Sequence, residues 1–122
     1  MIFKEKNDID ALCMEYAVKV VECVRQIVKE KKEFKMTDQL LRAGTSIGAN
    51  YGEAKFSESD VDYIHKVKIA LKECNESQYW LELLHKSNFL EEEKCQKLYE
   101  MAREIERLLT SCMVKAQAKC GK

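Results

Sequence analysis

The sequence predicts an all-α fold, an antiparallel up-down-up-down four-helix bundle. Three observations lead to this prediction. The 122 residues include no proline and only four glycines, and 34 % of them are charged, a composition typical of long helices with solvated faces. Four stretches of about 20 to 30 residues place apolar residues three or four positions apart. Short polar segments separate these stretches, so successive helices should lie antiparallel. We expect residues 1–122 to form one domain with a hydrophobic core.

The first predicted helix follows a short lead-in, residues 1–7, and runs to about residue 31. Asn7 or Asp8 is expected to cap its N-terminus. Its apolar face is wide, which indicates contact with more than one neighbour. It ends in KEKKEFK, where the lysines suit the negative end of the helix dipole. A basic patch is the alternative interpretation of this segment.

The second predicted helix contains the stretch QLLRAGTSIGANYGEA, residues 39–54. Gly44, Gly48 and Gly52 recur at every fourth position, and each costs a helix about 1 kcal/mol relative to alanine. Such a helix is favourable only if a second backbone packs closely against it, and a glycine-rich loop is the alternative. We expect Thr37 to cap this helix and the helix to end near Lys55.

A polar stripe lies on the same helix and is the best candidate for a catalytic cluster. A serine beside a glutamate, without histidine or lysine at helical spacing, is a poor nucleophile pair. We therefore predict a structural polar network whose partners come from a neighbouring helix, with a subunit contact or catalysis as alternatives. Its members are Arg42, Ser46, Asn50 and Glu53.

The third predicted helix spans Asp60 to Lys86, with a Ser57–Asp60 capping box or Ser59 at its start. Apolar residues occur on two sides of it, and the outer side is predicted to be an oligomer interface. Coverage by the fourth helix is the alternative. The predicted interface residues are Ile69, Tyr79, Trp80 and Leu83.

Three lysines of the third helix, Lys66, Lys68 and Lys72, are predicted to bind nucleic acid as a small anion-binding strip. Solvation and pairing with Glu73 or Glu76 is the alternative. The fourth predicted helix starts near Glu91, and its tail QAKCGK is expected to fray.

The composition argues against several other functions. Lys+Arg and Asp+Glu both number 21, so the net charge is zero and gives no general attraction to nucleic acid or membrane. The six cysteines show no CxxC spacing, and we expect no metal, no cofactor and mostly buried, inert thiols. No apolar run is long enough for a membrane span, and MIFKEKNDID lacks a signal-peptide core, so we expect a cytoplasmic protein.

The two blocks QLLRAGTSIGANYGEA and DYIHKVKIALKECNESQYWLELL resemble the bacterial four-helix-bundle proteins encoded in intervening sequences of 23S ribosomal RNA genes. Tyr51 and Gly52 depart from the aliphatic residue and alanine that are frequent there. The matching positions are Gln39, Leu40, Arg42, Ala43, Ser46, Ile47, Asn50, Glu53, Ala54, Ala70, Lys72, Glu73, Glu76, Trp80 and Leu81.

The resemblance implies a ring-like homopentamer associated with nucleic acid or ribonucleoprotein. A relative, the accessory protein of diversity-generating retroelements, binds a reverse transcriptase and nucleic acid, but it is strongly basic and this chain is neutral. We expect a non-catalytic homo-oligomer that binds RNA or DNA weakly. The alternative is a protein-interaction scaffold with no nucleic-acid binding.

Overall fold

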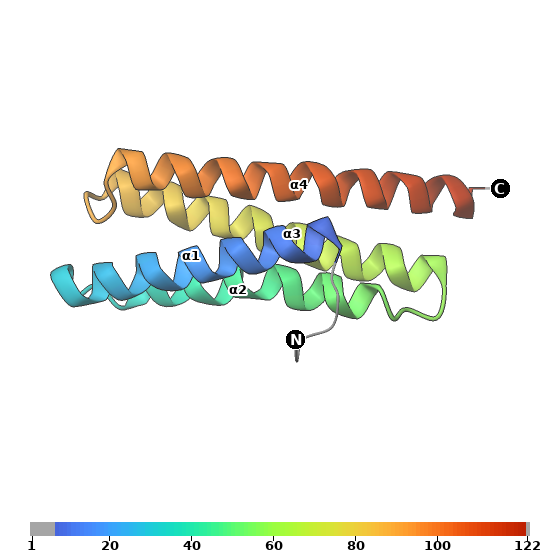
Figure 1. Ribbon diagram of the computed structural model, residues 1–122, viewed down its shortest axis with the longest axis horizontal. Coiled ribbons are helices and arrows are strands. Elements are labelled where there is room, and N and C mark those ends of the chain that lie inside the picture. The colour runs from blue at the N-terminus through green and yellow to red at the C-terminus, as the bar shows by residue number, and fades with distance from the viewer. Residues whose placement is uncertain (1–6, 122) are drawn as a thin grey trace.

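The computed structural model describes residues 7–121, and within this range the chain forms four α-helices and no strand (Figure 1). The predicted all-α fold with four helices is confirmed; residues 1–6 of the predicted lead-in lie outside the described range. The helices are α1 (Asp8–Lys31), α2 (Lys35–Ala54), α3 (Asp60–Lys86) and α4 (Glu92–Cys120).

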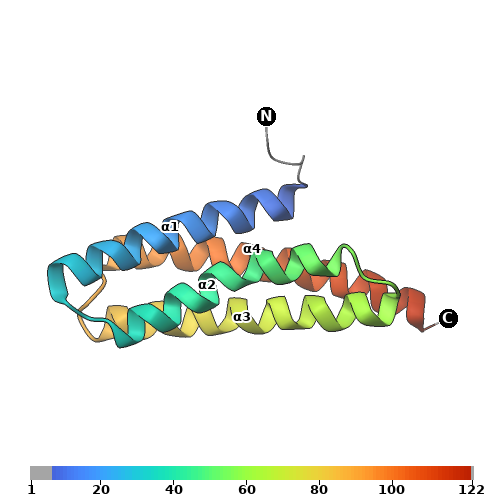
Figure 2. The same ribbon diagram turned by 90° about the horizontal axis from the view of Figure 1, so that it is seen from below.

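Short loops at alternating ends of the molecule join successive helices (Figure 1). Each helix packs on its neighbour in sequence, and α1 also packs on α4. Seen from below, α1 and α3 lie on opposite sides with α2 and α4 between them (Figure 2). The α2–α3 contact is the most extensive and the α1–α4 contact the least. The bundle is therefore packed unevenly, and its loosest seam lies between the first and last helices.

Local hydrogen bonds set the helix ends. Asn7 caps α1 through a capping box with Asp10, as expected. The prediction that Thr37 caps α2 is wrong, because α2 begins two residues earlier. The Glu33 carboxylate in the preceding loop accepts from the backbone N–H groups of Lys35, Met36 and Thr37 at 3.1, 3.0 and 2.9 Å. A loop carboxylate thus satisfies three N–H groups that would otherwise lack partners.

The α2–α3 loop and the C-terminus also differ in detail from expectation. Ser59 caps α3 by accepting from the N–H of Asp62. The Oγ atom of Ser57 is buried and has no hydrogen-bond partner among residues 7–121, so Ser57 does not form the predicted capping box. The predicted fraying tail is helical as far as Cys120.

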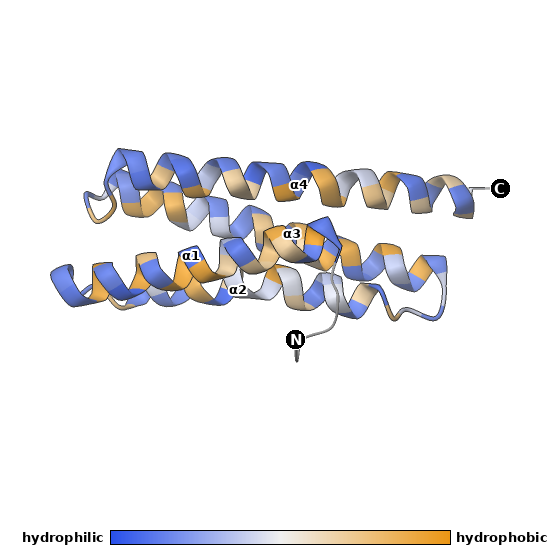
Figure 3. Ribbon diagram, in the orientation of Figure 1, coloured by the Kyte–Doolittle hydropathy of each residue, from blue (hydrophilic) through white to orange (hydrophobic). Residues whose placement is uncertain are grey.

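The core contains large apolar side chains from all four helices. Hydrophobic residues recur along every helix and are dense in the middle of α1 (Figure 3). Burial of a side chain of this kind contributes about 1.5–3 kcal/mol each. The largest apolar side chains that are fully buried are Tyr16, Leu40, Ile47, Leu81, Leu84, Ile105, Leu109, Val20 and Val67.

Two of the α2 glycines allow close approach of α1. A Cβ atom on Gly44 would lie 3.0 Å from Cγ2 of Val20, and one on Gly48 would lie 3.1 Å from Cβ of Cys13. A Cβ atom on Gly52 would meet nothing within 4 Å. The interpretation of the glycines as a packing surface therefore holds for Gly44 and Gly48 and is wrong for Gly52.

Candidate nucleic-acid and subunit interfaces

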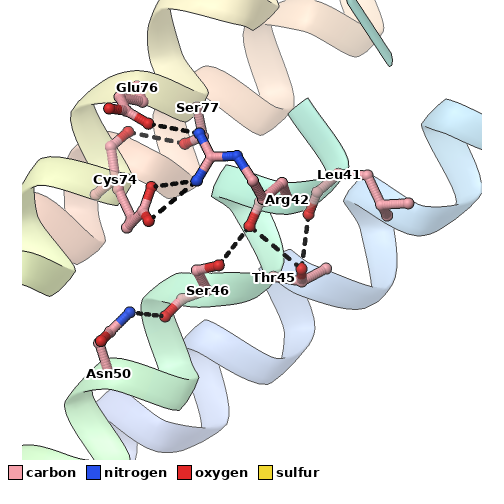
Figure 4. Close-up of polar contacts among 9 residues, drawn as sticks. Leu41, Arg42, Thr45, Ser46, Asn50, Cys74, Glu76 and Ser77 are labelled. Atoms are coloured by element: carbon pink, nitrogen blue, oxygen red, sulfur yellow. Dashed lines mark hydrogen bonds and ion pairs between the residues drawn. The ribbon is translucent and has the colours of Figure 1, made fainter. Parts of the chain in front are cut away.

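Arg42 links α2 to α3 across the outer edge of the most extensive helix contact (Figure 4). Its guanidinium donates to both oxygens of Glu73 at 3.2 Å and to Glu76 at 2.8 Å. The hydrogen bond from Arg42 holds the pKa of Glu76 below its ordinary value, and the bond to Glu76 together with the charge of Glu73 raises the pKa of Arg42. Half of the Arg42 side chain is exposed, so this cluster contributes more to the register of the two helices than to stability.

Ser46 and Asn50 of the predicted polar network bond within their own helix. Ser46 donates to the carbonyl of Arg42 at 2.5 Å, and Asn50 donates to the carbonyl of Ser46 at 2.8 Å (Figure 4). Glu53 is exposed one turn further on. Arg42, Ser46 and Asn50 therefore form a ladder of hydrogen bonds along α2 that does not include Glu53, and of the four residues only Arg42 is bonded to another helix. Glu73 and Glu76, considered as partners for lysines, bind Arg42 instead.

The three lysines of the predicted nucleic-acid site do not lie on one face of α3. At 100° per residue, Lys72 is about 40° around the helix from Lys68, but Lys66 is about 160° from it. Lys66 is half-buried and lies 3.6 Å from its neighbour Asp62. Lys68 and Lys72 are exposed. The basic strip thus consists of two lysines, and Lys66 belongs to a different side of the helix.

The predicted subunit interface on α3 is partly covered. Ile69, Trp80 and Leu83 are half-buried, while Tyr79 is 58 % exposed. The Tyr79 and Trp80 rings meet edge to face with their centroids 5.1 Å apart. A hollow of about 340 Å³ beside them is lined from α2 by Gln39 and Arg42. Helix α2 therefore borders the aromatic pair, and Tyr79 is the one of these four side chains that stays mostly exposed.

A groove between α1 and α4 was not predicted from the sequence. It encloses about 530 Å³ and follows the least extensive of the helix contacts. Near one end, Lys94 Nζ donates to Oε1 of Gln26 across the groove at 2.6 Å. The wide apolar face of the first helix was the one signal in the sequence that pointed to this region. The groove is lined by Lys19, Glu22, Cys23, Gln26, Lys94, Lys97, Leu98, Glu100, Met101 and Glu104.

The described part of the chain shows neither a group of metal ligands nor a buried thiol that is ionised at neutral pH. No group of three or more His, Cys, Asp or Glu residues between 7 and 121 is arranged to hold a metal ion. Burial raises the pKa of the Cys13 thiol to about 12 and those of Cys23 and Cys74 to about 11. Such thiols are protonated at neutral pH and react slowly. No described helix has the length and hydrophobicity required to cross a lipid bilayer.

Residues 7–121 thus form an all-α unit of four helices, with the Arg42 cluster on the α2–α3 seam and the groove on the α1–α4 seam. The chain belongs to the family of 23S rRNA-intervening sequence proteins, whose family model matches residues 5–111. This confirms the resemblance carried by the second and third helices.

A solved relative supports the same assignment. It is the crystal structure of a protein with unknown function from the S23 ribosomal protein family of Bacteroides thetaiotaomicron VPI-5482. The two chains are 43 % identical and superpose with a TM-score of 0.84, and the match covers 86 % of this chain and 97 % of that one. No match was found among curated proteins.

Proposed function

We propose that this protein is a non-catalytic, cytoplasmic, single-domain bundle of up-down-up-down topology. We further propose that it assembles into a ring-like homo-oligomer of five subunits and binds RNA weakly. Membership of the 23S rRNA-intervening sequence family is the observation that carries the proposal. The alternating ends at which the loops lie support the topology (Figure 1).

The basic strip of α3 supports a weak nucleic-acid site. Lys68 and Lys72 are exposed one helical turn apart, close enough to contact neighbouring phosphates. Two lysines alone bind poorly, and the net charge of zero adds no general attraction. A ring repeats the strip, and linked weak sites gain effective concentration when one strand spans several of them. Binding therefore depends on assembly.

The test is a fluorescence-anisotropy titration with a structured RNA at low and at physiological salt. Replacing both exposed lysines, Lys68→Gln and Lys72→Gln, should weaken binding and reduce its salt dependence, because fewer counterions are released. Lys66→Gln is the matched control, since Lys66 lies on another side of α3 and pairs with Asp62. The absence of binding by the unaltered protein at low salt would overturn the RNA proposal.

Self-association is tested separately by light scattering over a broad concentration range. We expect an oligomer, with five subunits as the expectation from the family, and a monomer at every concentration would contradict it. The second candidate function is a protein-interaction scaffold, favoured by the exposed aromatic ring of Tyr79. Binding of a protein partner through apolar contacts would change little with salt, whereas phosphate binding would weaken steeply.

A further inference from the structure

The hollow beside the aromatic pair of α3 combines an exposed ring with polar side chains. Tyr79 is 58 % exposed, and Trp80 is half-buried against it. We propose that this hollow receives one unpaired base of an RNA strand whose phosphates contact the basic strip. This inference rests on the proposed RNA binding and names the form of RNA that the site accepts. The hollow is lined by Gln39, Arg42, Asn75, Glu76, Tyr79 and Trp80.

The ring of Tyr79 is the surface on which a base would stack. Every base has an aromatic face, so an exposed aromatic side chain binds an unpaired base whatever its identity. The Trp80 ring meets that of Tyr79 at an interplanar angle of 83°. This contact restricts the rotation of Tyr79 before RNA binds, so less side-chain freedom is lost on binding.

Polar groups from two helices surround the aromatic pair. Gln39 of α2 and Asn75 of α3 are exposed, and each carries an amide that can donate and accept hydrogen bonds. The Arg42 guanidinium is held in place by its bonds to Glu73 and Glu76. These bonds also offset part of the negative charge that would otherwise oppose a nearby phosphate. The edges of a base therefore meet donors and acceptors from both α2 and α3.

The hollow adjoins the basic strip. At 100° per residue, Tyr79 lies about 20° around α3 from Lys68 and about 20° from Lys72, between the two. Lys72 and Tyr79 are about 10 Å apart along the helix axis, a distance that an RNA strand spans in a few nucleotides. The hydrogen bond from Arg42 is the main cause of the lowered pKa of Glu76, and the charge of Lys72 adds to it. A strand held by the lysines therefore reaches the hollow.

This arrangement favours RNA with unpaired bases. In a continuous duplex each base is paired and stacked on its neighbours, so none is free to stack on Tyr79. A duplex would contact only the lysines, through its phosphates. A single strand, a loop or a bulge offers phosphates and a free base together. We therefore expect unpaired RNA to bind more tightly than a duplex.

The site also restricts how copies of the chain assemble. Lys68, Lys72 and Tyr79 share one face of α3, so an assembly that leaves the lysines free for RNA leaves the Tyr79 ring free as well. Under this inference the subunit interface predicted from the sequence does not include Tyr79.

The first experiment separates stacking from phosphate binding. Fluorescence anisotropy follows a fluorescein-labelled RNA of unfolded sequence, alone and as a duplex with its complement. Tyr79→Ala should weaken binding of the single strand by about tenfold and leave duplex binding unchanged. Its salt dependence should stay the same, because no contact that releases counterions is lost. Tyr79→Phe keeps the ring and should bind as the parent does. Phe34→Ala is the matched control, since Phe34 is 59 % exposed and lies outside the hollow.

The outcomes distinguish this inference from the proposed function. Equal binding of the single strand by Tyr79→Ala and the parent protein would overturn the inference and leave RNA binding intact. Equal weakening for strand and duplex would also overturn it. Light scattering checks the assembly, and a smaller oligomer for Tyr79→Ala would place this ring in the subunit contact and overturn the inference. A parent protein that binds neither RNA at low salt would overturn both.

The second experiment observes the hollow directly. Trp80 is the only tryptophan in the chain, so its emission reports on this place alone. Its fluorescence, excited where RNA does not absorb, should change as the single strand is added and remain constant with the duplex. Lys68→Gln and Lys72→Gln together should move the midpoint of this change to higher RNA concentration. Constant Trp80 emission while anisotropy shows that the strand is bound would overturn the inference.

Discussion

Tyr16 of α1 donates its hydroxyl hydrogen to Oγ of Ser77 of α3 at 2.9 Å, and both side chains are shielded from solvent. Ser77 in turn donates to the carbonyl of Cys74 at 2.8 Å, and the Cys74 thiol lies 3.1 Å from the carbonyl of Ala102 on α4. These bonds connect the two helices that lie on opposite sides of the bundle and then reach a third. Because a hydrogen bond is directional and apolar contacts are not, this series helps to fix how the helices align along their length.

Ser77→Ala should destabilise the protein more than Tyr16→Phe. It leaves a buried tyrosine hydroxyl without an acceptor, which costs about 1–3 kcal/mol, whereas after Tyr16→Phe the serine still donates to Cys74. Adding Tyr16→Phe to Ser77→Ala should recover part of the loss. Urea unfolding of the two single variants and the double variant measures this coupling. Strictly additive losses would show that the bond does not couple the two helices.

Gly48→Leu should lower the free energy of unfolding by about 1–3 kcal/mol through overpacking. The Cys13 Cβ atom that it would meet is fixed by the α1 backbone, so only a shift of the whole helix relieves the contact. Gly52→Ala is the control, because space is open there, and it should stabilise α2 by up to about 1 kcal/mol. Equal unfolding midpoints for Gly48→Leu and the parent protein would contradict the close approach of α1.

Arg42→Gln should raise the pKa of Glu76 toward its ordinary value, since the hydrogen bond from Arg42 is the main cause of its depression. A depressed carboxyl pKa contributes stability above the pKa of the unfolded chain, and this stability is lost as pH falls through the folded value. The variant should therefore lose less stability on acidification. Carbon-13 NMR titration checks the shift, with Glu82 as an internal control because Lys86 lowers its pKa independently. Equal shifts at both carboxyls would point to a general change in the fold.

The protein should lose stability as pH rises from about 9 toward 11, because the unfolded thiols ionise there while those of Cys13, Cys23 and Cys74 remain protonated. The raised folded pKa values give stability that is complete below the unfolded pKa and declines above it. In this window each buried thiol lowers the free energy of unfolding by about 1.4 kcal/mol per pH unit. Urea unfolding at a series of pH values measures the total slope. Cys23→Ala should reduce that slope, and a slope unchanged by the substitution would contradict the assignment.

Helix positions were largely predictable because each helix carries a long apolar repeat. The expected α3, from Asp60 to Lys86, matches the structure residue for residue. Helix starts were less predictable: Thr37 has a good capping side chain, but Glu33 reaches three backbone N–H groups from the loop before it. A carboxylate that acts across several residues leaves no fixed spacing in the sequence.

The candidate surfaces were predicted only in outline. Spacing on one helix identified the outer apolar side of α3, but it could not show that Arg42 binds Glu73 and Glu76, because that depends on how α2 and α3 align. The prediction that Lys66 and Lys68 share one face of α3 was wrong, because the two side chains lie about 160° apart around the helix. The α1–α4 groove arises from loose packing between helices distant in sequence, so the wide apolar face of the first helix pointed to this region but could not locate the groove.

The glycine contacts between α2 and α1 restrict two positions of α2 in different ways. Residue 44 faces the side-chain methyl groups of residue 20, whereas residue 48 faces the Cβ atom of residue 13. Among homologues, a larger side chain at position 44 should therefore accompany a smaller one at position 20, position 48 should remain glycine, and position 52 should vary independently. Substitutions at positions 44 and 20 would then be inherited as a compensating pair.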